Sequence, residues 1–320
     1  MSGFKEQQMA IEVNDLTKVY AGGVEAVKGV TFTVRRGEVF GLLGPNGAGK
    51  STTIGMLTTT VSPTSGSAMV AGCDIATDPI GARAASAVVF QDAVVDRVLS
   101  GKRNLENHAR LWGVPSRAIA RRVADVTTRF GLDDLIERTV STYSGGQRRR
   151  LEIARSLISA PSVLFLDEPT VGLDPRIRHE LLDVIAGLRE AGEMTVVLTT
   201  HYLDEAERLC DRIAIVHEGR IVALDTPQAL LGALGHDVVE LRVASGAEPL
   251  LSFLRSRGVI GEGAFLVGST LTLPLRGTPT RYVFAAVDDF GAVVVASTAR
   301  PPTLDDVYLN LTGSSLVAAA

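Results

Sequence analysis

The chain has 320 residues, of which 46% are hydrophobic and 21% are charged, and its formal net charge at pH 7 is −4. This composition is typical of a folded protein and excludes a disordered chain or a coiled coil. The length predicts one large domain and a smaller second one. Because nucleic-acid binding needs an excess of Lys and Arg for phosphate contacts, the acidic balance argues against a general nucleic-acid partner.

Neither a membrane span nor a secretion signal is predicted. The longest uncharged run, residues 51–73, contains Gly and Pro and is rich in Thr and Ser, whereas a spanning helix needs roughly 20 mostly apolar residues. The first ten residues lack the apolar core and cleavage site of a signal peptide, so a cytoplasmic protein is expected. Cys73 and Cys210 lie far apart and outside any metal-binding spacing, and we interpret them as two buried thiols.

Short β-type runs alternate with longer amphipathic stretches, the pattern of an α/β sheet covered by helices. The runs are residues 31–34, 39–43, 87–90, 163–166, 195–200 and 213–216. One helix is predicted to begin after Asp174, a favourable N-cap, with Pro175 in its first position, and to end at Ala191-Gly192. The strands before and after this helix complete a βαβ unit, so a parallel sheet is expected.

A domain boundary is predicted near residue 235, where the chain reads Gly-Ala-Leu-Gly-His-Asp. Residues 1–235 would form the first domain. Residues 236–320 would form a small α+β domain, in which apolar runs and two amphipathic stretches predict the order β-α-β-β-α-β. That order is ferredoxin-like in kind.

A glycine-rich segment provides the strongest functional signal. Residues 44–51 read Gly-Pro-Asn-Gly-Ala-Gly-Lys-Ser between a predicted strand and a predicted helix, which matches G-x-x-x-x-G-K-[S/T] in both residues and context. The glycines allow the backbone to wrap phosphates, Lys50 is placed for the β- and γ-phosphates, and the Ser51 hydroxyl can bind Mg²⁺. The alternative is a glycine-rich turn with an accidental Lys-Ser.

Two carboxylates follow the apolar run 163–166. Asp167 is expected to hold Mg²⁺ directly or through water, while Glu168 would take a proton from the attacking water, a role worth roughly 10²–10⁴-fold in rate. A solvated acidic turn is the alternative interpretation.

Three further side chains are weaker candidates when taken alone. His201 follows the run 195–200 at the sheet edge where α/β proteins place ligands, and it could bond the γ-phosphate. Gln91 follows another run and could contact the metal or its water. Tyr20 could stack on adenine, although a packed hairpin tyrosine is an alternative.

Residues 142–156 contain a Ser-Gly-Gly turn that opens a helix with three arginines in its first turn, Arg148, Arg149 and Arg150. Exposed N–H groups and positive charge favour an anion at such a turn. For the arginines we favour a solvated helix face, with contact to a permease or a partner chain as the alternative.

These motifs, in this order, resemble those of an ATP-binding-cassette (ABC) nucleotide-binding subunit over about residues 10–230. The resemblance implies an α/β fold, a P-loop NTPase cassette with a mixed sheet core, an antiparallel β subdomain and a helical subdomain inserted at about residues 92–155. It implies ATP and Mg²⁺ as cofactors. In this family the Ser-Gly-Gly-Gln signature of one subunit closes on the γ-phosphate bound by the other, so two sites form at one symmetric interface.

The resemblance also implies a role for each matching residue. Tyr20 would stack on adenine, and Gln91 would link the nucleotide to a permease. Asp174 would lie in the loop that pairs the two sites. The catalytic residues would be Glu168, His201 and Lys50, and the metal-binding residues Ser51, Gln91 and Asp167. The other nucleotide-binding residues would be Gly44, Pro45, Asn46, Gly47, Ala48, Gly49 and Thr52 in the phosphate loop, and Ser144, Gly145, Gly146 and Gln147 in the signature.

The signature helix and the segment 301–313 resemble the daunorubicin-resistance type of ATP-binding protein. Such proteins serve separate ABC-2-type permeases that export drugs, lipids or glycoconjugates, although many carry Met where Gln147 stands. The resemblance implies an active ATPase coupled to transport, paired with a second copy or a paralogous cassette, and held by its permease at the cytoplasmic face of the membrane. Alternatives are an importer ATPase with a ligand-sensing C-terminal domain, a soluble non-transport ABC ATPase, and an inactive regulatory cassette.

Overall fold

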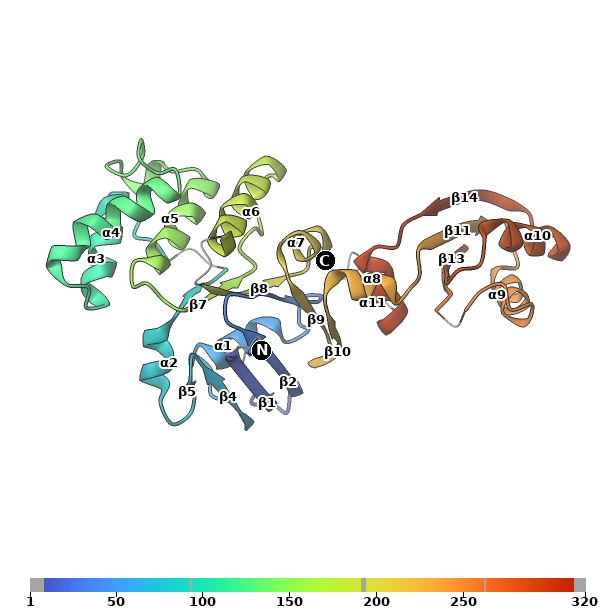
Figure 1. Cartoon of the computed structure of the whole chain (residues 1–320), viewed down its shortest axis with the longest axis horizontal. Coiled ribbons are helices and arrows are strands. Elements are labelled where there is room, and N and C mark those ends of the chain that lie inside the picture. The colour runs from blue at the N-terminus through green and yellow to red at the C-terminus, as the bar shows by residue number, and fades with distance from the viewer. Residues whose placement is uncertain (1–8, 92–93, 191–193, 262, 314–320) are drawn as a thin grey trace, which may run out of the picture. The chain divides into compact units, whose positions relative to one another are not determined.

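The computed structural model describes residues 9–91, 94–190, 194–261 and 263–313 (Figure 1). The chain divides into two compact units, residues 1–221 and 222–320. The boundary predicted near residue 235 lies a short way beyond this division, after helix α8 (Pro227–Gly232). Helix α8 contacts α11 (Leu304–Thr312), which places α8 with the second unit.

A six-stranded sheet forms the centre of the first unit. Its order is β10-β9-β3-β8-β7-β6. Strands β3, β7 and β8 are buried along their whole length, which explains why their sequences are apolar on both faces. Pairing of β7 with β8 is parallel, as the predicted βαβ unit requires. The strands are β3 (Val39–Leu43), β6 (Ser86–Val89), β7 (Val163–Asp167), β8 (Thr195–Thr200), β9 (Arg212–His217) and β10 (Arg220–Asp225).

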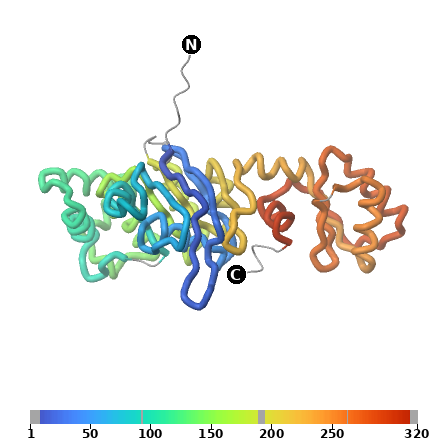
Figure 2. The backbone as a smooth tube through the Cα atoms, turned by 90° about the horizontal axis from the view of Figure 1, so that it is seen from below, coloured from blue at the N-terminus to red at the C-terminus, as the bar shows by residue number. Residues whose placement is uncertain are grey.

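A second, four-stranded sheet has the order β2-β1-β4-β5. Strands β1 and β2 form the long antiparallel hairpin that is dark blue in Figure 2, and Tyr20 lies just after β1. One face of the hairpin supplies buried apolar side chains and the other is exposed, as expected for an antiparallel sheet covered on one side. The strands are β1 (Met9–Val19), β2 (Glu25–Arg35), β4 (Ser65–Val70) and β5 (Cys73–Asp74).

Eight helical segments belong to the described part of the first unit. They are α1 (Lys50–Leu57), α2 (Pro79–Ala85), α3 (Gly101–Leu111), α4 (Ser116–Arg129), the 3₁₀ turn η1 (Val140–Thr142), α5 (Gly145–Leu157), α6 (Pro175–Glu190) and α7 (Leu203–Leu209). Helices α3, α4 and α5 contact one another and form a helical subdomain within the predicted insert (Figure 1). Of that insert, residues 92–93 lie outside the described residues.

Helix α6 begins where the sequence predicted. The Asp174 carboxylate accepts a hydrogen bond from the backbone N–H of Ile177 at 3.0 Å, and Pro175 is the first helical residue. The predicted end of the helix at residues 191–192 lies outside the described residues.

The second unit has the predicted order β-α-β-β-α-β, followed by α11. Its four strands lie in the antiparallel order β12-β13-β11-β14. One hydrophobic cluster contains Leu250 and Leu254 of α9, Val283 and Val287 of α10 and the sheet residue Leu241, so the core lies between the two helices and the sheet. The elements are β11 (Asp237–Val243), α9 (Ala247–Ser256), β12 (Phe265–Val267), β13 (Thr270–Leu275), α10 (Thr280–Phe290) and β14 (Val294–Arg300).

The two cysteines differ in burial. Cys210 is buried, but Cys73, on the short strand β5 at the edge of the sheet, is half-buried. The interpretation as two buried thiols is therefore correct only for Cys210.

Candidate functional site

The glycine-rich segment is a tight loop between β3 and α1. Gly49 precedes α1 with φ of 101°, and a Cβ there would lie 2.4 Å from the carbonyl oxygen of Ala26, so the loop requires glycine at this position. Lys50 folds back into the loop, and its Nζ donates to the carbonyl oxygens of Gly44 at 2.8 Å and Pro45 at 3.0 Å. An ammonium beside a helix N-terminus is the arrangement that favours an anion.

A cavity of about 500 Å³ opens over this loop. The loop and the first turn of α1 line one side of it, and the rest is lined by Tyr20, Val24, Ala26, Gln91 and Glu168. Tyr20 is 41% exposed, and its hydroxyl lies 3.4 Å from Thr52 Oγ1. The volume is in the range of small-molecule sites, and the aromatic ring has room for a ligand beside it.

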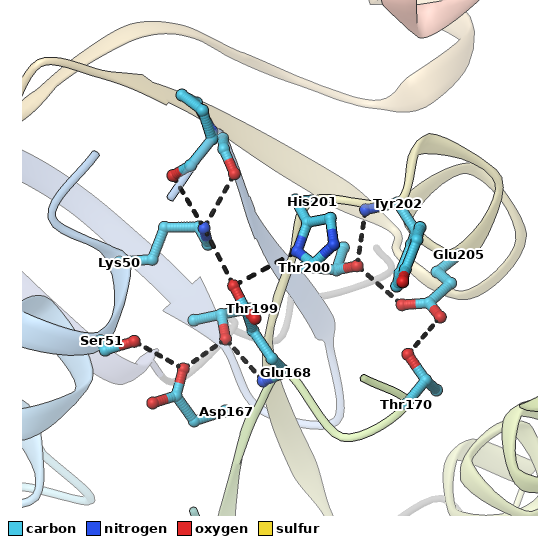
Figure 3. Close-up of polar contacts among 12 residues, drawn as sticks. Lys50, Ser51, Asp167, Glu168, Thr170, Thr199, Thr200, His201, Tyr202 and Glu205 are labelled. Carbon is cyan, nitrogen blue, oxygen red and sulfur yellow. Dashed lines mark hydrogen bonds and ion pairs between the residues drawn. The ribbon is translucent and has the colours of Figure 1, made fainter. Parts of the chain in front are cut away.

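Two hydroxyls converge on the carboxylate of Asp167, at the end of β7. Ser51 Oγ donates to Asp167 Oδ1 at 3.0 Å, and Thr199 Oγ1 donates to the same oxygen at 2.6 Å (Figure 3). Carboxylate and hydroxyl oxygens are the ligands that Mg²⁺ prefers. The sequence predicted Ser51 and Asp167 for this place but not Thr199.

Glu168 lies beside the lysine and the histidine. Its Oε1 is 3.1 Å from Lys50 Nζ and 3.4 Å from His201 Nδ1 (Figure 3). Glu168 is 7% exposed. The His201 Nδ1 atom is buried and has no hydrogen-bond partner among the described residues, which is unusual for a buried polar atom.

The backbone at Glu168 is strained. Its φ is 45°, a left-handed conformation that non-glycine residues seldom adopt and that is concentrated at functional sites. The Glu168 N–H donates to Thr199 Oγ1 at 2.9 Å. The hydroxyl of Thr199 therefore bonds both carboxylate residues at once.

A buried carboxylate, Glu205 of α7, connects the ends of the two central strands. It is 0% exposed and accepts hydrogen bonds from Thr200 Oγ1 at 2.7 Å and from the Thr170 hydroxyl (Figure 3). Arg178 Nε also donates to it at 2.7 Å. Thr170 lies two residues after Glu168, and Thr200 immediately precedes His201. Sequence reasoning did not find Glu205, because a glutamate in an amphipathic helix is ordinarily exposed.

The Ser-Gly-Gly-Gln segment begins α5. Ser144 Oγ accepts from the backbone N–H of Gln147 at 3.3 Å, and Gln147 Oε1 accepts from the Ser144 N–H at 2.9 Å, a reciprocal capping box. A Cβ at Gly146 would lie 2.0 Å from Ile177 Cγ2, so glycine allows α5 to approach α6. Ser144 and Gly145 are exposed. Among the described residues, none of these four lines the 500 Å³ cavity.

The arginines after this segment do not form a solvated face, and that prediction is wrong. Arg149 is 7% exposed because its side of α5 faces the loops that follow β6 and β7. Arg148 Nη1 donates to the Tyr143 carbonyl oxygen at 2.7 Å, and Arg150 pairs with Glu180 of α6. Both are half-buried.

Asp174 lies away from the cavity lining among the described residues. Its side chain caps α6 and is exposed. A role for Asp174 between two sites therefore stays a prediction.

Comparisons with known proteins identify the family. The family model described as "ABC transporter" matches residues 27–171. The chain is 47% identical to the daunorubicin/doxorubicin resistance ATP-binding protein DrrA of Streptomyces peucetius, over 95% of this chain and 92% of the relative. It is 36% identical to the Nod factor export ATP-binding protein I of Burkholderia orbicola, over 96% of this chain and 98% of the relative.

A solved structure gives the same result for the fold. The cbiO1 structure from Clostridium perfringens, described as part of the ABC transporter complex cbiONQ, superposes with a TM-score of 0.65 at 30% identity, covering 69% of this chain and 90% of that one. The chain therefore belongs to the ABC transporter family, and it is an ATPase of the type that couples ATP hydrolysis to transport. No helix among the described residues has the length and apolar character that a membrane span requires.

Proposed function

We propose that this chain is the ATP-hydrolysing subunit of a membrane exporter. Two copies would bind two MgATP between them and drive a drug, lipid or glycoconjugate through a separate ABC-2-type permease. Lys50, Ser51 and Glu168 line the cavity, and His201 and Asp167 contact Glu168 and Ser51 from behind that lining. This cluster carries the proposal for the chemistry.

Phosphate binding would rearrange the contacts of Lys50. In the described structure its ammonium bonds two loop carbonyls and lies 3.1 Å from Glu168. The β- and γ-phosphates would compete for that ammonium, since charge-assisted bonds to phosphate are stronger than bonds to neutral carbonyls. Glu168 would then be released to accept a proton from the attacking water, while the His201 ring bonds the γ-phosphate.

The oxygens of Ser51 and Asp167 fit a Mg²⁺ ion that accompanies the nucleotide, with Gln91 on the same cavity wall. Bound there, the ion would neutralise charge on the β- and γ-phosphates. The protein's own part is to hold these oxygens in place, which Thr199 does for Asp167.

The exposed N-terminus of α5 supports a shared site. Ser144 and Gly145 are exposed and lie outside the chain's own cavity lining, and a capped helix N-terminus favours phosphate. We infer that they contact the nucleotide of a second copy, and that the reciprocal contact completes the other site.

The proposal for the exported class rests on the relatives. DrrA is named for daunorubicin and doxorubicin resistance, and the second relative for Nod factor export, and both match over nearly the whole chain. We infer that the permease recruits this chain to the cytoplasmic face of the membrane.

Hydrolysis by the purified chain tests the chemistry. Wild-type protein should hydrolyse MgATP, Lys50→Ala should abolish turnover, and Glu168→Gln should lower the rate by about 10²–10⁴-fold while an ATP-stabilised dimer accumulates. Wild-type turnover in Glu168→Gln, with no such dimer, would show that Glu168 is not the base.

Recovery of the tagged chain from native membranes tests the export proposal. We expect a polytopic permease with ABC-2-type organisation to accompany it. Ribosomal proteins in its place would identify a soluble, non-transport ATPase.

A further inference from the structure

Arg149 joins three parts of the first unit through its guanidinium. Nε donates to the carbonyl oxygen of Pro169 at 2.8 Å, and Nη2 to that of Asp167 at 3.3 Å. Nη1 donates to the carbonyl oxygen of Phe90 at 2.5 Å and to Glu152 Oε2 at 3.0 Å. A buried guanidinium of this kind costs free energy unless its donors are satisfied, and these contacts satisfy it.

Two of these carbonyls lie immediately before and after Glu168. Arg149 therefore holds the backbone on both sides of the residue with φ of 45°. A left-handed non-glycine residue persists only where its surroundings fix it. Arg149 supplies that restraint together with Thr199, which accepts the Glu168 N–H.

The third carbonyl fixes the chain immediately before Gln91. Phe90 precedes Gln91 and accepts from Arg149, and the Val94 N–H after it donates to Glu152 Oε1 at 2.7 Å. Arg149 and Glu152 lie one turn apart on α5 and form an ion pair in which both side chains are under a tenth exposed. The pair therefore holds Phe90, next to Gln91, and Val94 from the helix that Ser144 begins.

We propose that Arg149 is a positioning residue for hydrolysis: it fixes Glu168 and Gln91 relative to α5, so that a shift of α5 moves both. The proposal rests on the function proposed above, in which the N-terminus of α5 contacts a partner's nucleotide. When the partner's nucleotide binds Ser144 and shifts α5, the Arg149 guanidinium transmits that shift to Glu168 and Gln91 of the same chain. No substrate contact by Arg149 itself is required.

The sharpest variant is Arg149→Lys. It retains the positive charge beside Glu152, but a lysine ammonium is a point charge that cannot reproduce the planar fork spanning three carbonyls. Misplacing a reacting group by about 1 Å costs up to about 10²-fold in rate. We expect kcat for MgATP to fall about 10- to 100-fold, with KM and the Kd for a fluorescent ATP analogue within about two-fold of wild type. Arg121→Lys on α4, whose side chain is 86% exposed, is the matched control and should change neither.

A double-mutant cycle separates positioning from general damage. If Arg149 acts through Glu168, Arg149→Lys should lower the single-turnover rate less in the Glu168→Gln background than in wild type, because only its effect through Gln91 remains. An additive loss, a parallel rise in KM and Kd, or wild-type kcat in Arg149→Lys would each overturn the proposal. A low Tm would show that Arg149→Lys is poorly folded, and a second variant then replaces it. The double variant Arg149→Gln/Glu152→Gln removes both buried charges and should give the same fall in kcat with an unchanged Kd. An unchanged kcat in the double variant would also overturn the proposal.

The proposed function fails in a different way. It fails if wild-type protein shows no hydrolysis that depends on Lys50. If wild-type protein hydrolyses MgATP and Arg149→Lys does so equally well, the role of Arg149 alone is disproved.

Discussion

Thr199 supports both candidate carboxylate residues with a single hydroxyl. It is fully buried, donates to Asp167 Oδ1 and accepts from the Glu168 N–H. Its hydroxyl therefore fixes the direction of the oxygen that Ser51 also bonds. Thr199 is not expected to contact the nucleotide, yet it determines the geometry of Asp167 and Glu168, which are.

Thr199→Val should weaken both the fold and the proposed metal site. Valine leaves the Glu168 N–H buried without an acceptor, which costs about 1–3 kcal/mol of unfolding free energy. It also leaves Asp167 free to rotate, so a higher Mg²⁺ concentration should be needed for half-maximal hydrolysis. Urea unfolding and Mg²⁺ titrations of ATPase rate test this, with Thr298→Val on the exposed strand β14 as the control. An unchanged Mg²⁺ requirement would show that Thr199 does not position Asp167.

At the residue scale, the sequence predicts the side chains that belong to motifs with a fixed spacing. It does not predict the side chains that act through hydrogen bonds to main-chain carbonyls. Lys50, Asp167, Glu168 and His201 converge because neighbouring parallel strands bring their carboxyl ends to one edge of the sheet. Arg149 could not be placed in this way. Its partners are main-chain carbonyls, which any sequence supplies, so only the packing of α5 shows where they lie.

At the scale of elements, α7 connects the ends of β7 and β8 through Glu205. The Thr170 and Thr200 hydroxyls and the Arg178 guanidinium all donate to this carboxylate. Arg178 of α6 also lies 3.9 Å from the centroid of the Tyr202 ring, a cation–π distance. Helices α6 and α7 therefore hold the chain on either side of His201 and after Glu168.

Glu205→Gln should destabilise the chain and slow hydrolysis. Arg178 keeps its bond to Asp204, but the neutral amide weakens its pair with residue 205, and the NH₂ group faces hydroxyl donors that lose their acceptor. We therefore expect a loss of about 1–3 kcal/mol, the range for leaving buried polar groups unsatisfied. Glu207→Gln, on the exposed side of the same helix, should change stability by less than about 0.5 kcal/mol. Urea unfolding of the two variants tests the expectation. Equal stability of the two proteins would mean that the Glu205 network contributes little.

In the second unit, α11 is held by an arginine on β14. Arg300 donates to both carboxylate oxygens of Asp306, at 2.6 and 2.9 Å, and Thr303 and Asp306 form a capping box. Burial by itself raises the pKa of Asp306, but the hydrogen bonds from Arg300 and Thr303 outweigh it, and the pKa lies below its ordinary value.

The stabilisation from Asp306 should disappear in acid. A carboxylate with a lowered folded-state pKa contributes stability above its unfolded pKa of about 4, and that contribution is lost as pH falls through the folded-state value. The Tm difference between wild type and Asp306→Asn should therefore be constant above about pH 5 and shrink below about pH 4. Calorimetry over this range tests it, with the exposed Asp288→Asn as control. A difference that persists unchanged in acid would exclude a role for the Asp306 charge.

The elements themselves were predictable where periodicity or caps were strong. The capped start of α6, the buried runs β3, β7 and β8 and the β-α-β-β-α-β order agree with the structure. The long hairpin β1–β2 was underestimated, because only residues 31–34 read as an apolar run, while its exposed face carries polar residues. Helix α11 lies in the segment 301–313, for which the sequence predicts a family resemblance but no helix.

At the scale of the whole molecule, the proposed sites divide one chain's residues between two nucleotides. Lys50 and Glu168 would act on the nucleotide bound by their own chain. Ser144 would act on the partner's. This division predicts which pairs of inactive variants restore activity when mixed, a result that no single-chain site gives.

Mixing Lys50→Ala with Ser144→Arg should restore hydrolysis, although neither variant hydrolyses ATP alone. In a heterodimer, one site contains both substitutions and is inactive. The other site is intact, because its phosphate loop comes from the Ser144→Arg chain and its signature comes from the Lys50→Ala chain. With equal mixing, half of the dimers are heterodimers with one intact site in two, so up to about a quarter of wild-type activity should return. Mixing Lys50→Ala with Glu168→Gln should restore none, because each site then contains one defect from its own chain. ATPase rates of the two mixtures decide the matter: recovery in both, or in neither, would contradict a site completed by Ser144 of the second copy.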